Sequence, residues 1–167
     1  MKYFAYGSNM YSRRLAERIS SCRFHAVAWL PEYRLAFHKR GSDGSGKCDV
    51  VYTGNPGDTV PGVVYEIGEA DRRILDAIEG VGRGYLGTSR DVVVAGKRAT
   101  VYLYVTDERA VDETVRPFCW YRDFVLAGAR EHGFPEAYLR MLEGVGCDPD
   151  PRPERERLNR RLLQGDG

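Results

Sequence analysis

The chain has 167 residues, with 25 Lys and Arg against 24 Asp and Glu, and a net charge of +1 at pH 7. This length fits one domain with a substantial core, and the balanced charge argues against the basic face of a nucleic-acid-binding protein. No apolar run approaches the ~20 residues that cross a bilayer, and the N-terminal apolar stretch is too short for a signal peptide. We therefore expect a cytoplasmic protein with no nucleic-acid or membrane partner.

The first ten residues combine a short apolar run with a polar turn. Residues 2–6 predict a strand and residues 11–19 a short helix, with three arginines outside its apolar face. Between them, Gly7 would let the backbone approach a ligand closely, and free N–H groups at the helix start suit an anion. A buried strand followed by an ordinary helix cap at Ser8 or Asn9 explains the same residues.

The remaining periodicities predict strands at residues 24–29, 33–37, 49–53, 62–67, 89–94 and 98–105, and helices at 70–79, 116–132 and 136–142. Strands come first and helices last, which favours an α+β fold whose mixed or largely antiparallel sheet can curl into a barrel. We expect one domain over residues 1–146, followed by a Pro- and charge-rich tail over 147–167 with a short helix at 154–163.

Two segments resemble nucleotide-binding motifs without their context. Residues 41–48 approach a P-loop, but Cys48 stands where the Mg²⁺-binding hydroxyl belongs and a strand follows instead of a helix. Residues 82–87 fit G-x-G-x-x-G, but they follow a helix and precede a strand, which reverses the order of a dinucleotide-binding fold. We therefore interpret both as glycine-rich connections.

Cysteine and histidine positions give no sign of a metal site. No C-x-x-C pair or histidine cluster is present. The four scattered cysteines are expected to be free thiols in a reducing cytoplasm: Cys22, Cys48, Cys119 and Cys147.

Glu79 is the carboxylate with the most unusual position. It follows Leu75 by four residues, on or beside the apolar stripe of the predicted helix, and it ends that helix before Gly80. Partial burial and the helix dipole both disfavour a negative charge there, which suits a group that exchanges protons. A surface glutamate at a frayed helix end explains the same pattern.

Two stretches together resemble a known family. Tyr-Phe-Ala-Tyr-Gly-Ser-Asn at residues 3–9 resembles the N-terminal signature of the γ-glutamylcyclotransferases, and Leu-Asp-Ala-Ile-Glu-Gly-Val at 75–81 resembles their second signature. The likeness continues through residues 44–46, 60–65, 101–104 and 121–138, so it covers about residues 1–142. It implies a compact mixed barrel flanked by helices, with no metal or organic cofactor.

The resemblance also implies a reaction and a site. The α-amine of a γ-glutamyl group would attack its own side-chain carbonyl, giving 5-oxoproline and a free amine, with Glu79 as general acid and base. Tyr85 and Tyr104 are expected either to line this site or to pack in the core. The other substrate-binding residues that the resemblance implies are Tyr3, Phe4, Ala5, Tyr6, Gly7, Ser8, Asn9 and Tyr121.

Several alternatives stay open at this point. The chain could be a relative that binds a small acid without turnover, a cyclotransferase specific for γ-glutamylamines, or, more remotely, a nucleotide-binding protein that uses residues 41–48. The sequence fixes neither the leaving amine, nor the oligomeric state, nor the role of the tail.

Overall fold

A computed structural model describes residues 1–165, and its centre is a closed five-stranded barrel. The strands follow the order β1-β5-β2-β6-β7 around the barrel. Their bounds are Lys2–Ala5 (β1), Arg23–Pro31 (β2), Thr59–Glu66 (β5), Tyr85–Val94 (β6) and Lys97–Thr106 (β7). Neighbours are antiparallel except β1 and β7, whose parallel pairing of Tyr3 with Tyr102 closes the barrel. The predicted mixed, largely antiparallel barrel is confirmed.

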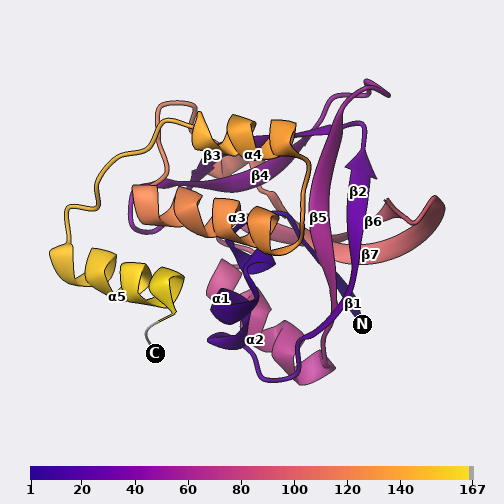
Figure 1. Ribbon diagram of the computed structural model, residues 1–167, viewed down its shortest axis with the longest axis horizontal. Helices are drawn as coiled ribbons and strands as arrows, with labels where there is room; N and C mark the ends of the chain where they lie inside the picture. Colours follow the sequence, from indigo (N-terminus) through magenta and orange to yellow (C-terminus); the bar gives the residue numbers. More distant parts are fainter. Residues whose placement is uncertain (166–167) are drawn as a thin grey trace.

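The remaining elements surround one side and one end of the barrel (Figure 1). Tyr33–Arg40 (β3) and Gly46–Tyr52 (β4) form a separate two-stranded sheet. The helices are Ser12–Ala16 (α1), Glu69–Glu79 (α2), Cys119–Glu131 (α3), Glu136–Glu143 (α4) and Pro153–Gln164 (α5), with short 3-10 helices at Ser8–Met10 (η1) and Glu108–Ala110 (η2). None of the described helices has the length and apolar character needed to cross a membrane.

Strand β1 is buried in the barrel core, and this burial fixes the position of the first residues of the chain. Phe4 is fully buried, and its ring fills the space beside Gly62 of β5, where an added Cβ would lie 2.4 Å from the ring. The N-terminal amine donates to the carbonyl of Ile67 at 2.7 Å. Apolar burial on both faces thus holds the strand in register and fixes where the next residue, Gly7, turns away.

Helix α3 packs tightly against the turn that follows β1. A Cβ at Gly128 would lie 2.6 Å from the backbone nitrogen of Tyr11 and 2.6 Å from the Cβ of Met10. Only a glycine permits this approach of two backbones. The start of the same helix carries Tyr121, whose hydroxyl oxygen would lie 3.5 Å from a Cβ at Gly7.

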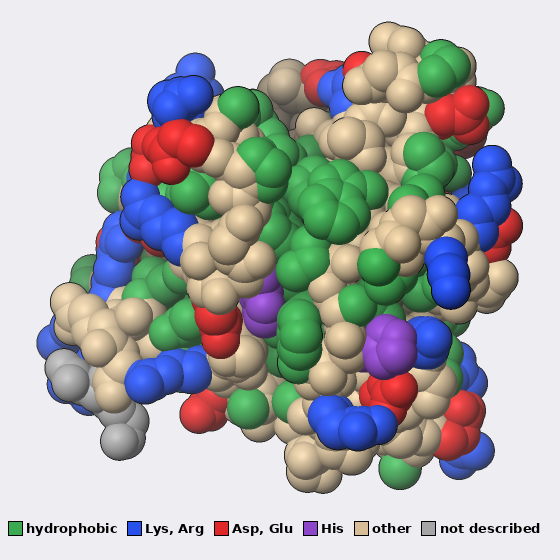
Figure 2. Space-filling model, turned by 45° about the vertical axis from the view of Figure 1, so that its right-hand side comes forward, with side chains coloured by type: hydrophobic (Ala, Val, Ile, Leu, Met, Phe, Trp, Pro, Cys, Tyr) green, Lys and Arg blue, Asp and Glu red, His purple; other side chains and the backbone are tan. Residues whose placement is uncertain are grey.

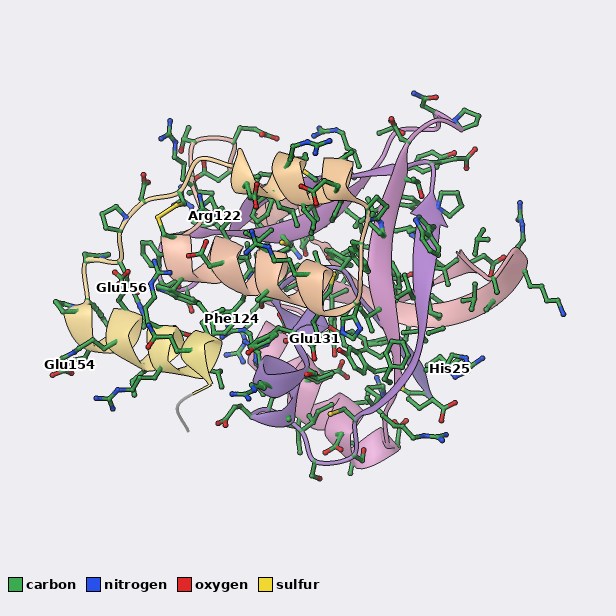
Figure 3. All side chains as sticks on the ribbon, viewed as in Figure 1. His25, Arg122, Phe124, Glu131, Glu154 and Glu156 are labelled. Atoms are coloured by element: carbon green, nitrogen blue, oxygen red, sulfur yellow. A yellow bond between two sulfur atoms is a disulfide. The ribbon has the colours of Figure 1, made fainter. Side chains whose placement is uncertain are left out.

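The segment after residue 146 is attached to α3. Cys119 and Cys147 form a disulfide, visible as the yellow bond in Figure 3, so the expectation of four free thiols is wrong. The sequence holds no C-x-x-C signal for this pair because the fold brings the two cysteines together over a separation of 28 residues. Cys22 and Cys48 are free. The expectation of a cytoplasmic location rested partly on four free thiols and loses that support.

The surface is mixed in character. In Figure 2, hydrophobic side chains gather in the middle of one face, and Lys, Arg, Asp and Glu side chains lie around its margin. Within residues 1–165, no group of three or more His, Cys, Asp or Glu side chains could hold a metal ion.

Candidate active site

A small pocket forms where the turn after β1, the end of α2, the start of α3 and strand β4 meet. Its volume is about 30 Å³, and ten residues line it. Nine of them were predicted as substrate-binding or catalytic residues, and Cys48 is the one addition. The lining residues are Tyr3, Tyr6, Gly7, Ser8, Asn9, Cys48, Glu79, Tyr85, Tyr104 and Tyr121. Residues more than one hundred positions apart in the sequence therefore share one pocket.

Glu79 is held through one of its two carboxylate oxygens. Arg18 donates to Oε1 at 2.7 Å and Asn9 donates to the same atom at 3.0 Å. No described residue donates to Oε2, so this oxygen is available to a bound molecule. The side chains of Arg18 and Glu79 are only 20% and 19% exposed, which strengthens the ion pair relative to one in open solvent.

The end of α2 fixes where this carboxylate lies. Gly80 adopts a left-handed conformation with φ of 73° and caps the helix, as the sequence predicts. Buried Leu75 anchors the same helix to the core one turn earlier. Glu79 therefore leaves the last turn of α2 in a defined direction, instead of fraying into solvent.

Three buried tyrosines form the opposite wall. The hydroxyl of Tyr6 donates to the carbonyl of Tyr104 and that of Tyr85 to the carbonyl of Cys48, each at 2.5 Å. The hydroxyl of Tyr121 accepts from the backbone N–H of Cys48 at 3.1 Å. Burial raises the pKa of each of these three phenols, so all three are neutral.

The turn after β1 offers backbone donors to the pocket. A Cβ at Gly7 would lie 3.0 Å from the Cβ of Cys48, so glycine is needed for close packing against β4. The backbone N–H groups of Gly7, Ser8 and Asn9 donate to no acceptor among the described residues. Three successive free N–H groups at the edge of a pocket can bind an anion.

Two predicted site residues lie elsewhere. Phe4 and Ala5 are buried in the barrel core and do not line the pocket. Successive side chains of a strand point to opposite faces, so Tyr3 reaches the pocket while Phe4 points to the other face of β1. Tyr104 contributes its ring, but its hydroxyl points away and donates to Asp76 at 2.9 Å.

The two nucleotide-like segments have ordinary structural roles. Residues 41–45 form the turn between β3 and β4, and residues 82–84 form the turn that enters β6. Neither segment opens a helix, which confirms the interpretation of both as connections.

Sequence reasoning missed the contribution of Arg18. It lies just after α1, outside the apolar face, a position that usually points to solvent. Its guanidinium instead contacts both Glu79 and the Oδ1 of Asn9, the latter at 2.9 Å. Arg14, one helical turn earlier, donates to the hydroxyl of Ser8 at 3.1 Å. The spacing of four residues between the two arginines was the available signal.

Comparison with known proteins gives consistent results. A family profile described as γ-glutamyl cyclotransferase, AIG2-like, matches residues 3–122. The γ-glutamylcyclotransferases of Bos taurus and Homo sapiens are each 32% identical over 153 residues, which cover 86% of this chain and 77% of theirs. A solved structure described as a γ-glutamyl cyclotransferase superposes with a TM-score of 0.83 at 27% identity, covering 96% of this chain and 98% of that one. The chain belongs to the AIG2-like γ-glutamyl cyclotransferase family of enzymes.

Proposed function

We propose that this enzyme converts the γ-glutamyl group of a small substrate into 5-oxoproline and releases the attached amine, with Glu79 as the proton carrier. The observation that carries the proposal is the arrangement at Glu79. Its Oε1 is fixed by Arg18 and Asn9, and its Oε2 has no partner among the described residues. A carboxylate held in this way can accept a proton without changing position.

The substrate would bind with its α-carboxylate at the turn after β1. The free N–H groups of Gly7, Ser8 and Asn9 suit that charge. The pocket of about 30 Å³ has room for one small polar group, so the rest of the substrate extends outward past Glu79. This orientation places the α-amine next to the carboxylate that is to take its proton.

Cyclisation then needs two proton transfers. Glu79 removes a proton from the α-ammonium, and the amine nitrogen attacks the carbonyl carbon of the γ-amide to form a tetrahedral intermediate. The C–N bond to the leaving amine breaks as Glu79 returns the proton to that nitrogen. The attacking nitrogen gives up its second proton through the same carboxylate, so that the products are the neutral lactam of 5-oxoproline and an ammonium ion. The nucleophile is part of the substrate, so the protein contributes orientation and proton transfer.

The other polar groups of the pocket stay neutral during this reaction. Burial raises the pKa of the Cys48 thiol to about 12, so it is protonated at neutral pH and is a poor nucleophile. Burial also raises the pKa of Tyr3, whose hydroxyl accepts from the amide of Asn9 at 2.9 Å. Glu79 is therefore the pocket's proton-accepting group.

Substitution of Glu79 tests the proposal. In Glu79→Gln, 5-oxoproline release should fall by about 10²–10⁴-fold, because an amide cannot accept the proton. The melting temperature should change little. Glu17→Gln is the matched control, since Glu17 is exposed just after α1. Full turnover in Glu79→Gln, or 5-oxoproline binding by the wild type without turnover of any γ-glutamyl compound, would refute the mechanism.

A further inference from the structure

The pocket at Glu79 opens into a second, larger hollow. The outer hollow has a volume of about 690 Å³, and it shares four residues with the inner pocket: Ser8, Glu79, Tyr85 and Tyr121. A substrate whose γ-glutamyl end occupies the inner pocket must therefore place its amine half in the outer hollow. The residues that line this hollow decide which amine half fits.

The outer hollow is strongly basic. Seven Lys and Arg side chains line it, against two carboxylates, Asp43 and Glu79. The whole chain carries a net charge of only +1, so this excess of five positive charges is a local feature. A concave surface lined by one sign of charge attracts ligands of the other sign.

Four of the seven cations have a carboxylate partner within the protein. Arg18 pairs with Glu79, Lys47 with Asp43, Arg40 with Asp112 and Arg109 with Asp107. The other three, Arg14, Lys39 and Arg83, form no ion pair with a described residue. The positive charge of the hollow is thus not fully balanced by the protein.

Lys39 is the most informative of the three. The residue as a whole is only 8% exposed, and its ammonium makes no hydrogen bond or ion pair with the described residues. Its nearest recorded partner is the ring of Tyr85, 4.6 Å away. Burial lowers the pKa of Lys39, as expected for a cation removed from water. An anion that reached this ammonium would form a charge-assisted hydrogen bond with it, which is one of the stronger kinds.

Local backbone structure directs Lys39 into the hollow. The pairing of β3 with β4 shifts register between Ala36 and Lys39, which re-aims the side chains at the end of β3. An added Cβ at Gly84 would lie 3.1 Å from the Lys39 ammonium nitrogen. The glycine therefore leaves room for the ammonium beside the entry to β6.

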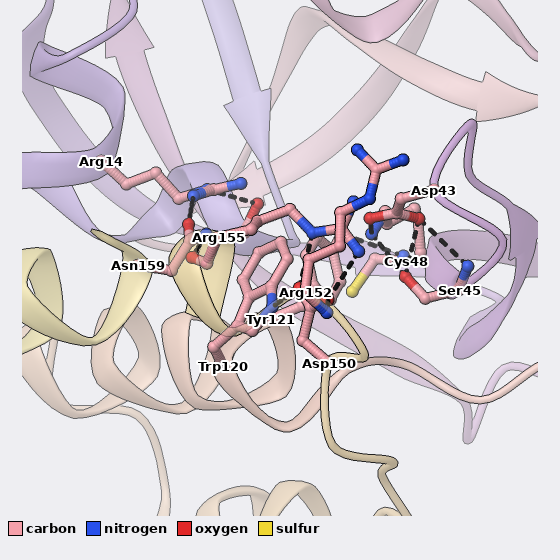
Figure 4. A network of polar contacts seen from close by, with 12 residues as sticks. Arg14, Asp43, Ser45, Cys48, Trp120, Tyr121, Asp150, Arg152, Arg155 and Asn159 are labelled. Carbon is pink, nitrogen blue, oxygen red and sulfur yellow. Dashed lines mark hydrogen bonds and ion pairs between the residues drawn. The ribbon is translucent and has the colours of Figure 1, made fainter. Parts of the chain in front are cut away.

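Arg14 occupies another part of the same hollow. Its guanidinium lies over the ring of Phe124 at 4.3 Å and donates to the side chain of Asn159 at 3.2 Å (Figure 4). Burial lowers the pKa of Arg14 to about 9. Arg14 forms no ion pair with a described residue; the charge of Arg18 opposes its own charge, and only the more distant carboxylate of Glu79, already paired with Arg18, favours it.

We propose that the amine half of the substrate carries at least two negative charges, which the outer hollow binds through Lys39, Arg14 and Arg83. This inference rests on the proposed function, because it assumes that the γ-glutamyl end lies at Glu79. A dicarboxylic amino acid and a phosphorylated amine share the required chemistry.

Paired substrates that differ in charge but little in shape test the inference. We would measure 5-oxoproline release from γ-glutamyl-glutamate and γ-glutamyl-glutamine, and from γ-glutamyl-phosphoserine and γ-glutamyl-serine. The charged member of at least one pair should have a kcat/KM about tenfold higher at low salt, because charge-assisted hydrogen bonds are the stronger ones. The preference should shrink at high salt. The pair with the larger ratio of charged to neutral kcat/KM shows whether the hollow prefers a second carboxylate or a phosphate.

Variants locate the preference. Lys39→Met keeps the aliphatic stem and removes the charge, so the ratio of charged to neutral kcat/KM should fall to near one. Arg83→Gln, at an exposed position, should lower the ratio without endangering the fold. Arg73→Gln is the control, because Arg73 is exposed on α2 and lines neither pocket.

The two hypotheses fail in different ways. Equal kcat/KM for charged and neutral members of both pairs in the wild type would overturn the charge preference and leave the proposed function standing. An unchanged ratio in both Lys39→Met and Arg83→Gln would also overturn it. Failure of every γ-glutamyl compound to yield 5-oxoproline would overturn the proposed function itself.

Discussion

Asn9 connects three other side chains of the pocket through a single amide. Its nitrogen donates to Tyr3 at 2.9 Å and to Glu79 at 3.0 Å, and its oxygen accepts from Arg18 at 2.9 Å. Every one of these contacts bears on the position of the proposed proton carrier. Asn9 is therefore a positioning residue, and its substitution should lower kcat more than it lowers the free energy of unfolding.

We predict that Asn9→Asp lowers kcat by about 10–100-fold, since it loses the donor to Glu79 and sets two carboxylates side by side. The KM should change less than kcat. Steady-state 5-oxoproline release and thermal unfolding measure the two effects. Asn55→Ala, in the exposed turn before β5, is the control. A melting temperature that falls in proportion to kcat would contradict the positioning role.

The β3–β4 hairpin shows how an element that is absent from the barrel still shapes the site. His38 and Lys39 are adjacent and both buried, but only Lys39 lines the outer hollow. The imidazole of His38 bonds Asp49 at 2.9 Å and Glu113 at 2.8 Å, and none of these three residues lines the outer hollow. This anchor holds the end of β3 and with it the direction of Lys39.

The same anchor makes stability depend on pH. Burial lowers the pKa of His38, but the hydrogen bonds to Asp49 and Glu113 outweigh it and the net pKa is raised. A raised pKa in the folded state stabilises the protein below the unfolded value of about 6.5, and the effect is lost as pH rises through the folded pKa.

We therefore expect His38→Asn to destabilise the fold by about 1–3 kcal/mol at pH 6 and by clearly less at pH 9. Urea unfolding at both values measures the difference. His25→Asn serves as the control, because His25 faces the partly exposed Glu66 on the barrel. An equal loss at the two pH values would show that protonated His38 does not stabilise the hairpin.

The elements of the fold could be predicted more fully than the contacts between them. Strand β1, the end of α2 at Glu79 and the left-handed Gly80 follow from local patterns of burial and capping. Side chains alternate between the two faces of a strand, so Phe4 is expected to point away from the pocket once Tyr3 is known to line it. The contacts of Arg18 with Glu79 and of Lys39 with Tyr85 join segments some 46 to 61 residues apart, and no local pattern encodes such a pair.

At the scale of the whole molecule, the tail is joined to the site-bearing helix. The disulfide ties residue 147 to the first residue of α3. Beyond it, buried Asp150 accepts from the indole of Trp120 at 2.8 Å and pairs with Arg155 of α5 at 2.5 Å. Trp120 precedes Tyr121, so the tail supports the wall of the pocket from behind.

We predict that the disulfide contributes about 3.5 kcal/mol, because it closes a loop of 28 residues in the unfolded chain. Cys119→Ser with Cys147→Ser should lower the melting temperature by several degrees, whereas Cys22→Ser should not. Thiol titration of the denatured, unreduced protein should count two thiols. A count of four would show that the bond does not form in solution.

The parallel pairing of β1 with β7 also sets an order of events during synthesis. Strand β1, with the turn at Gly7 after it, has its barrel partners later in the chain, at residues 63–66 and at Tyr102. The ribosome synthesises these partners after β1. The apolar side chains of β1 therefore stay unpaired and exposed to solvent until residues 63–66 and Tyr102 have emerged. Contacts between such distant segments also slow folding. The turn that would bind the α-carboxylate of the substrate is thus translated before the strands that hold it in place, and it becomes ordered only after them.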